Sequence, residues 1–199
     1  MRLAEVFYSI QGEGPAMGRP ATFIRLAGCN LSCAGCDTDL KPWQDLAIPE
    51  VQSKVTGSRV IITGGEPTLQ MSELAELIRL LCLDGKEIHI ESNGTNLIPE
   101  EVLKNIRCVV ISPKRGSGFH LDFWSGKRNV HLKFVMGSAP WCWTSEQLEK
   151  LVPTLARDRV WLMAYGAEQD MAGAANVWDL ALRLGVNYSD RLHIRMMKR

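Results

Sequence analysis

Three cysteines, Cys29, Cys33 and Cys36, lie within one short segment, AGCNLSCAGCDTD. Thiolates bind both iron–sulfur clusters and zinc, so this CxxxCxxC spacing predicts a metal centre held by a single loop. A [4Fe–4S] cluster usually takes four protein ligands. Because the triplet supplies only three, the spacing favours a cluster with one iron open to a ligand that is not protein. A zinc site completed by a remote His or Cys, or three buried thiols without a ligand, are the alternatives.

Further polar groups follow apolar, strand-like segments at three separate places. The sequences are TGGEP at 63–67, ESNGT at 91–95 and SPK at 112–114. Glycines let a backbone approach a ligand closely, and a carboxylate or a lysine can bind the charged ends of one. We expect these three motifs to converge on one site with the cysteine loop.

The elements that position these groups alternate between strands and helices. The expected strands are 3–9, 22–26, 59–63, 87–91, 108–112, 130–135 and 160–164. The expected helices are 71–83, 101–105, 145–155 and 172–184. This alternation predicts an α/β protein with a mainly parallel sheet and right-handed crossovers. Ligand sites in such sheets lie beyond the carboxyl ends of the strands, where the three polar motifs stand.

The composition indicates an ordinary globular protein. The chain has 199 residues, of which 46% are apolar and 23% charged, and this length suits one domain, residues 1–199. A net charge of +1 does not favour direct binding of nucleic acid. There is no long apolar run and no signal-peptide pattern, so we expect a cytoplasmic protein without a membrane span. Six cysteines in such a chain favour metal or redox use over disulfides.

The cysteine triplet followed by GGEP resembles the radical S-adenosylmethionine (SAM) enzymes. More specifically, the sequence is similar to the 7-carboxy-7-deazaguanine synthase family of queuosine and deazapurine biosynthesis. The matching segments are YSIQGEG at 8–14, FIRLAGCNLSCAGCDT at 23–38, TGGEP, ESNGT and SPK. They occur in the family's order, and QGEG with the extended cysteine segment is the most specific part. The resemblance implies a modified, incomplete (β/α) radical SAM barrel.

The resemblance also implies cofactors and a reaction. The cofactors are a [4Fe–4S] cluster, SAM and Mg²⁺. The reaction contracts the ring of 6-carboxy-5,6,7,8-tetrahydropterin with loss of ammonia and gives 7-carboxy-7-deazaguanine. It makes the enzyme a carbon–nitrogen lyase in which no side chain acts as a nucleophile, because the radical arises at the cluster and SAM. The implied partners are a one-electron reductant such as flavodoxin or ferredoxin, and a second copy of the chain in a homodimer.

The family pattern assigns each motif a ligand. In this pattern the three cysteines bind the cluster, and Thr38 binds magnesium. The residues assigned to SAM are Gly35, Asp37, Gly64, Gly65, Glu66, Ser92, Ser112, Pro113 and Lys114. Within this set Glu66 would accept a hydrogen bond from the SAM ammonium group, and Lys114 would pair with a carboxylate.

The residues assigned to the pterin are Gln11, Gly12, Glu13, Arg25, Thr63 and His193. Glu13 can accept N–H bonds from an aminopyrimidine edge, and Arg25 can form a bidentate pair with the substrate carboxylate. The resemblance is weaker near the end of the chain, where RLHIRMMKR is short and basic and 162–170 lacks the Gln-Pro pair of many members.

Two rival hypotheses remain at this point. A glycyl-radical-activating enzyme would share the cluster and SAM, but YSIQGEG and the absence of further cysteine clusters disfavour it. A non-catalytic Fe–S or zinc interaction module would not need GGEP and SPK at successive strand ends.

Overall fold

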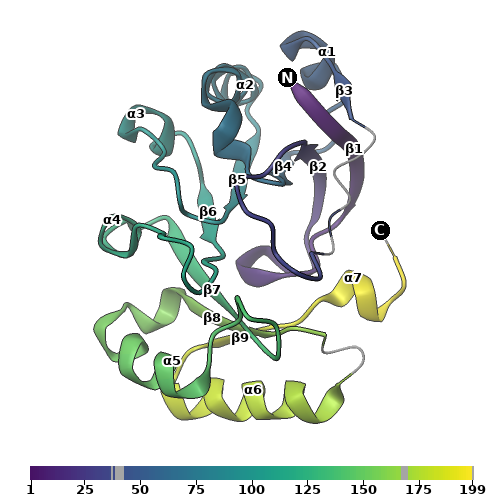
Figure 1. The fold of residues 1–199 in the computed structure, drawn as a ribbon. Helices are drawn as coiled ribbons and strands as arrows, with labels where there is room; N and C mark the ends of the chain where they lie inside the picture. The colour runs from purple at the N-terminus through teal and green to yellow at the C-terminus, as the bar shows by residue number, and fades with distance from the viewer. Residues whose placement is uncertain (37, 39–42, 167–169, 199) are drawn as a thin grey trace.

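The computed structural model describes residues 1–36, 38, 43–166 and 170–198. Its centre is a nine-stranded sheet with the order β3-β1-β2-β4-β5-β6-β7-β8-β9 (Figure 1). The strands are β1 Arg2–Ile10, β2 Pro20–Leu26, β3 Gln44–Asp45, β4 Arg59–Gly64, β5 Glu87–Ser92, β6 Cys108–Ile111, β7 Val130–Met136, β8 Val160–Ala164 and β9 Asn187–Ser189. β1 pairs antiparallel with β2 and β3, and every pair from β2 onward is parallel.

The helices are α1 Ile48–Ser53, α2 Met71–Leu83, α3 Glu100–Leu103, α4 Leu121–Ser125, α5 Ser145–Leu151, α6 Met171–Leu184 and α7 Leu192–Arg195. Figure 1 shows α2 to α6 along the outer side of the curved sheet. Leucines and an isoleucine of α2 recur at helical spacing, and this face is fully buried against the sheet. The main core therefore lies between the sheet and its outer helices.

Alternation along each parallel strand separates this core from the inner side of the sheet. Ile24, Ile62 and Ile90 belong to the core on the helix side. Their neighbours in sequence point the other way because successive side chains of a strand alternate between faces. Arg25 and Thr63 are paired across β2 and β4 in the register of the sheet. The inner side of the sheet thus carries polar groups that the helices do not cover.

The end of the chain returns across this inner side. The Gly14 amide donates to Ser189 Oγ at the end of β9 over 2.9 Å, and the Leu192 amide of α7 donates to the Gly12 carbonyl over 3.0 Å. The segment 189–192 is therefore fixed to the loop that follows β1. Among the described strands, β3 and β9 are the sheet edges and do not pair, so the barrel remains open.

The predicted fold class, an α/β protein with a modified, incomplete (β/α) barrel of the radical SAM type, is confirmed. The predicted helix 145–155 ends earlier, at Leu151, and continues as a 3-10 turn over Val152–Thr154. Pro153 explains the change, because proline lacks the N–H that a continuing helix needs. None of the described helices has the length and apolar character that crossing a membrane requires.

Candidate active site

A cavity of about 630 Å³ lies at the carboxyl ends of the parallel strands. Most of the residues proposed from sequence line it: Gln11, Gly12, Glu13, Arg25, Cys29, Cys33, Gly35, Cys36, Thr38, Thr63, Gly64, Gly65, Ser92, Ser112, Lys114 and His193. Glu66 and Pro113 are outside the lining, and Asp37 lies outside the described residues. The three strand-end motifs and the cysteine loop therefore meet, as the sequence predicts.

The cysteine loop is held in place by two aromatic side chains from distant segments. Trp141 Nε1 donates to the Ala34 carbonyl over 2.9 Å, and Tyr165 Oη donates to the Gly35 carbonyl over 3.2 Å. The two rings pack edge to face with centroids 5.2 Å apart. The stretch around Trp141 thus anchors the loop that carries the cysteines.

The donor set of this loop fits an iron–sulfur cluster. Cys29, Cys33 and Cys36 all line the cavity, and Lys114 lies near enough to Cys33 to oppose the effect of burial, which raises the pKa of that thiol. No three Cys, His, Asp or Glu side chains of the described residues converge as a single metal ion would require. A cluster does not need such convergence, because each thiolate binds a different iron.

The remaining cysteines have a different environment. Cys108 and Cys142 are buried, and Cys82 packs against the main core. Burial raises the pKa of the Cys108 thiol to about 12, so this thiol stays protonated at neutral pH. The cysteines outside the loop therefore serve packing.

The turn after β4 depends on glycine. Gly64 has φ +131°, and a Cβ there would lie 2.1 Å from the Leu26 carbonyl oxygen. The Gly65 amide donates to that same oxygen over 3.1 Å, and the next amide donates to the Gly28 carbonyl over 2.9 Å. The glycine turn is thereby joined to the start of the cysteine loop, and Gly65 faces the cavity beside it.

Glu66, which the sequence predicts to contact SAM, lies behind the cavity wall. Its side chain is fully buried, and its carboxylate accepts hydrogen bonds from the Thr68 amide and hydroxyl, the Ser92 hydroxyl and the Asn93 amide. These bonds join the turn after β4 to the end of β5. The carboxylate supports the wall of the cavity from behind and does not line it.

SPK forms another part of the wall. Lys114 Nζ donates to the Ser112 carbonyl and hydroxyl, each over 3.0 Å, and lies 5.1 Å from the Trp141 ring centroid. The Pro113 carbonyl points away to accept from Trp143 Nε1 over 2.8 Å. Lys114 thus presents a cation to the cavity between β6 and the anchor of the cysteine loop.

Arg25 presents a second cation from β2. Its Nε donates to Glu5 Oε1 over 2.8 Å, and one terminal nitrogen donates to Thr38 Oγ1 over 3.4 Å. The guanidinium also lies 5.8 Å from the centroid of the Phe7 ring. These contacts hold the guanidinium plane at the cavity wall next to Thr38, the predicted magnesium ligand.

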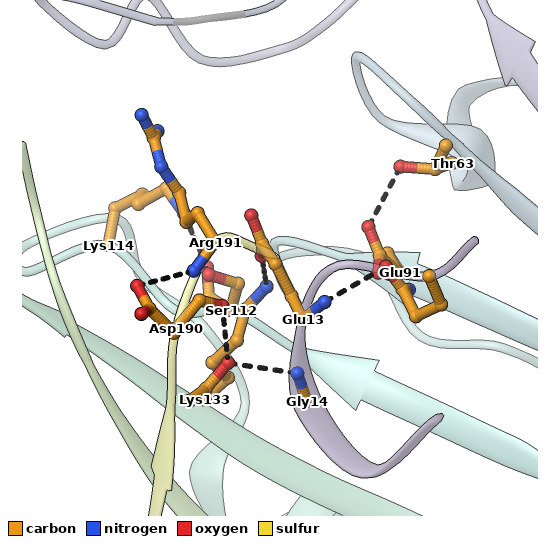
Figure 2. Close-up of polar contacts among 11 residues, drawn as sticks. Glu13, Gly14, Thr63, Glu91, Ser112, Lys114, Lys133, Asp190 and Arg191 are labelled. Carbon is orange, nitrogen blue, oxygen red and sulfur yellow. Dashed lines mark hydrogen bonds and ion pairs between the residues drawn. The ribbon is translucent and has the colours of Figure 1, made fainter. Parts of the chain in front are cut away.

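Two acidic side chains of the cavity, Glu13 and Glu91, have polar partners on neighbouring elements (Figure 2). Glu91 accepts from Gln11 Nε2 over 2.8 Å and from Thr63 Oγ1 over 3.1 Å. Glu13 forms an ion pair with Lys133 of β7. We did not predict Glu91 or Lys133 as site residues. Lys133 stands between the apolar residues Leu132 and Phe134, which is a usable signal because buried charges are almost always paired. Glu91 gives no such signal, because β5 also carries Glu87, His89 and Ser92.

His193 lies against Gly12, where there is no space for a larger residue. A Cβ on Gly12 would lie 2.1 Å from His193 Nδ1. We expect Gly12→Ala to displace the segment from β9 to α7 and to weaken binding of the pterin that the sequence resemblance implies by about tenfold or more, because ligand contacts depend on sub-ångström placement. Equilibrium dialysis measures the change. Gly126→Ala is the control, since a Cβ there meets no atom closer than 3.7 Å. Equal affinity in both variants would contradict this role for Gly12.

A partly closed parallel barrel with a three-cysteine loop and a glycine turn in one cavity defines the class of radical SAM enzymes. Comparison with known proteins narrows the class. A 7-carboxy-7-deazaguanine synthase of Pyrobaculum aerophilum is 32% identical over 211 residues, covering 98% of this chain and 93% of that protein. The chain belongs to the 7-carboxy-7-deazaguanine synthase family.

Two further comparisons agree with this membership. The Methanospirillum hungatei enzyme of the same name is 40% identical over 149 residues, which span 69% of this chain and 62% of that protein. The crystal structure of QueE from Escherichia coli matches with a TM-score of 0.71 and 25% identity, covering 96% of this chain and 94% of that one. No family model matches the chain.

Proposed function

We propose that this cavity converts 6-carboxy-5,6,7,8-tetrahydropterin to 7-carboxy-7-deazaguanine by ring contraction with loss of ammonia, in 7-deazapurine (queuosine) biosynthesis. One observation carries the proposal. A single cavity combines the cysteine loop with the Arg25 cation on β2, the acceptor Glu13 in the loop after β1 and the acceptor Glu91 on β5. A carboxylated aminopyrimidine has complementary groups: an anion at one end and N–H donors at the other.

The chain's own residues suit the two cofactors of this reaction. Cys29, Cys33 and Cys36 would ligate three irons of a [4Fe–4S] cluster, and SAM would complete the fourth. Gly65, Ser112 and Lys114 line the cavity beside the loop and suit SAM, whose carboxylate would meet the lysine ammonium. When bound, the cluster and SAM would supply the electron and the radical that removes hydrogen from carbon 6 of the pterin.

The wall of the cavity would bind and orient the substrate. Arg25 would hold its carboxylate, while Gln11, Glu13 and Thr63 would fix the ring edge. Thr38 would bind Mg²⁺, with substrate oxygens and water completing an octahedron. The Thr38 hydroxyl already lies 3.4 Å from the Arg25 guanidinium, which would bring metal and substrate carboxylate to the same place.

The cellular setting is also part of the proposal. The reaction needs a one-electron reductant such as flavodoxin or ferredoxin, because the cluster must be reduced before it can donate an electron to SAM. Free cysteines and a cluster ligand set suit the reducing cytoplasm. A homodimer is proposed by analogy with the family.

Anaerobic reconstitution with iron, sulfide, SAM, Mg²⁺ and dithionite tests the function. We expect mass spectrometry to detect 7-carboxy-7-deazaguanine from carboxytetrahydropterin. A Cys33→Ala variant serves as the control, and we expect it to lose both the cluster absorbance and the product. If the wild-type protein cleaves SAM but leaves the pterin unchanged, the substrate assignment is wrong. If it binds zinc and never cleaves SAM, the radical assignment is wrong as well.

A further inference from the structure

A buried ion pair joins two distant parts of the cavity. Lys133 of β7 contacts Glu13 in the loop after β1, a separation of 120 residues in sequence. The exposed fractions of the two side chains are only 6% for Lys133 and 14% for Glu13. Both residues line the cavity, and Figure 2 shows their side chains directed toward each other. Neither the sheet nor the core requires a lysine at this place, since its neighbour Phe134 is the one that packs among the outer helices.

The backbone around Glu13 is fixed independently of the ion pair. The Glu13 amide donates to Gln11 Oε1 over 3.1 Å, and the Gly14 amide donates to Ser189 Oγ. Hydrogen bonds therefore fix the backbone of Glu13, and Lys133 fixes its carboxylate. Lys133 contacts one oxygen, Oε2, whereas a carboxylate offers about four lone-pair positions in total. Acceptor capacity remains for a ligand in the cavity.

We propose that Lys133 is a positioning residue that holds the Glu13 carboxylate in place as an acceptor, and that this pair selects a ring edge carrying N–H donors. The inference rests on the proposed function and names what decides its substrate class. A 2-amino-4-oxopyrimidine edge offers an exocyclic N–H and a ring N–H to one carboxylate. A 2,4-dioxo edge places a carbonyl oxygen where the amino group would be, and two acceptors then face each other.

Removal of the Lys133 ammonium should reduce the preference for the 2-amino-4-oxo edge over the 2,4-dioxo edge, in addition to weakening binding. Glu13 without Lys133 would be a mostly buried carboxylate without its counter-charge. Such a group loses the contact that fixes its position and turns toward water. The ring edge would then face no fixed acceptor, so the site would tolerate a carbonyl as well as an amino group. Loss of discrimination between the two edges is thus the specific sign of the proposed role.

Two analogues with an oxidised ring test this role. Neither has a hydrogen on carbon 6, so the enzyme binds them without turnover. They are 6-carboxypterin, with the 2-amino group, and 6-carboxylumazine, with oxygen in its place. Equilibrium dialysis is done anaerobically on cluster-loaded protein with SAM. We expect wild-type protein to prefer the pterin by about 100-fold or more, because a site built for hydrogen bonding rejects a mismatched analogue strongly.

Lys133→Met should weaken pterin binding by about 30-fold and reduce the preference below about tenfold. Lys133→Arg keeps the charge and should retain the preference. Lys133→Gln, which keeps a neutral donor and serves if the methionine variant does not fold, should also lose most of it. Lys127→Met removes a lysine that pairs with Glu100 outside the cavity, and it should match the wild type in both measurements.

A double-mutant cycle separates positioning from general damage. Glu13→Gln alone should abolish the preference, since an amide both donates and accepts. Adding Lys133→Met to it should then change pterin affinity by no more than about threefold, because the two residues act as one unit. Equal losses with and without Glu13, or an unchanged preference in Lys133→Met, would overturn the inference. If the wild-type protein binds neither analogue, the proposed function fails and the inference fails with it.

Discussion

Arg25→Ala is expected to weaken binding of carboxytetrahydropterin by about 100-fold while the cluster and SAM remain bound. The guanidinium is held at the cavity wall by Glu5 and lies next to Thr38. It is one of the cations that line the cavity, and it emerges from β2, away from the SPK motif that suits SAM. Loss of its planar pair of donors should therefore weaken binding of the substrate carboxylate, while binding of the cluster and SAM is unchanged.

Two variants sharpen this test. Arg25→Lys keeps the charge but loses the bidentate fork, so we expect an intermediate affinity. Glu5→Gln keeps Arg25 but weakens the contact that orients it, and a loss of no more than about tenfold is expected because this pair is partly exposed. Substrate affinity comes from equilibrium dialysis and cluster content from absorbance. An Arg25→Ala protein with full substrate affinity would exclude Arg25 from the site.

The sequence predicts the strands well because their buried residues are apolar, β-branched and bounded by turns. The same patterns do not predict the short elements β9 and α7. β9 has three residues and α7 has four, too few for a periodic pattern to emerge. Their positions are set by contacts such as the Leu192 amide to the Gly12 carbonyl, which form only after the sheet exists. Tertiary contacts thus define what local sequence does not.

The site shows the same division between local and distant information. Motifs such as CxxxCxxC and SPK are contiguous, and a parallel sheet brings their strand ends together, so their convergence could be predicted. The ion pair of Glu13 with Lys133 joins segments whose distance depends on the order of nine strands. Local pattern carries no information on that order. Lys133 is nevertheless marked by its place between Leu132 and Phe134, where an unpaired lysine would be costly.

Glu66 belongs to a motif that the sequence assigns to SAM, and the structure shows a network of buried hydrogen bonds around its carboxylate. We expect Glu66→Ala to lower the free energy of unfolding by about 3–5 kcal/mol, because it leaves several buried donors without an acceptor. These donors belong to Thr68, Ser92 and Asn93, on two segments that the carboxylate joins. Urea denaturation of the cluster-free protein measures the loss without any contribution from SAM.

Glu66→Gln separates support of the wall from direct contact with SAM. The amide has nearly the same shape, but its nitrogen cannot accept the hydrogen bonds made to one carboxylate oxygen. If Glu66 supports the wall, this variant should lose about 1–3 kcal/mol of unfolding free energy. The reconstituted variant should still bind SAM, and any loss of SAM affinity should accompany the loss of stability. A variant of unchanged stability that no longer binds SAM would instead make Glu66 a direct ligand, and the carboxylate would have to leave its buried hydrogen bonds when SAM binds.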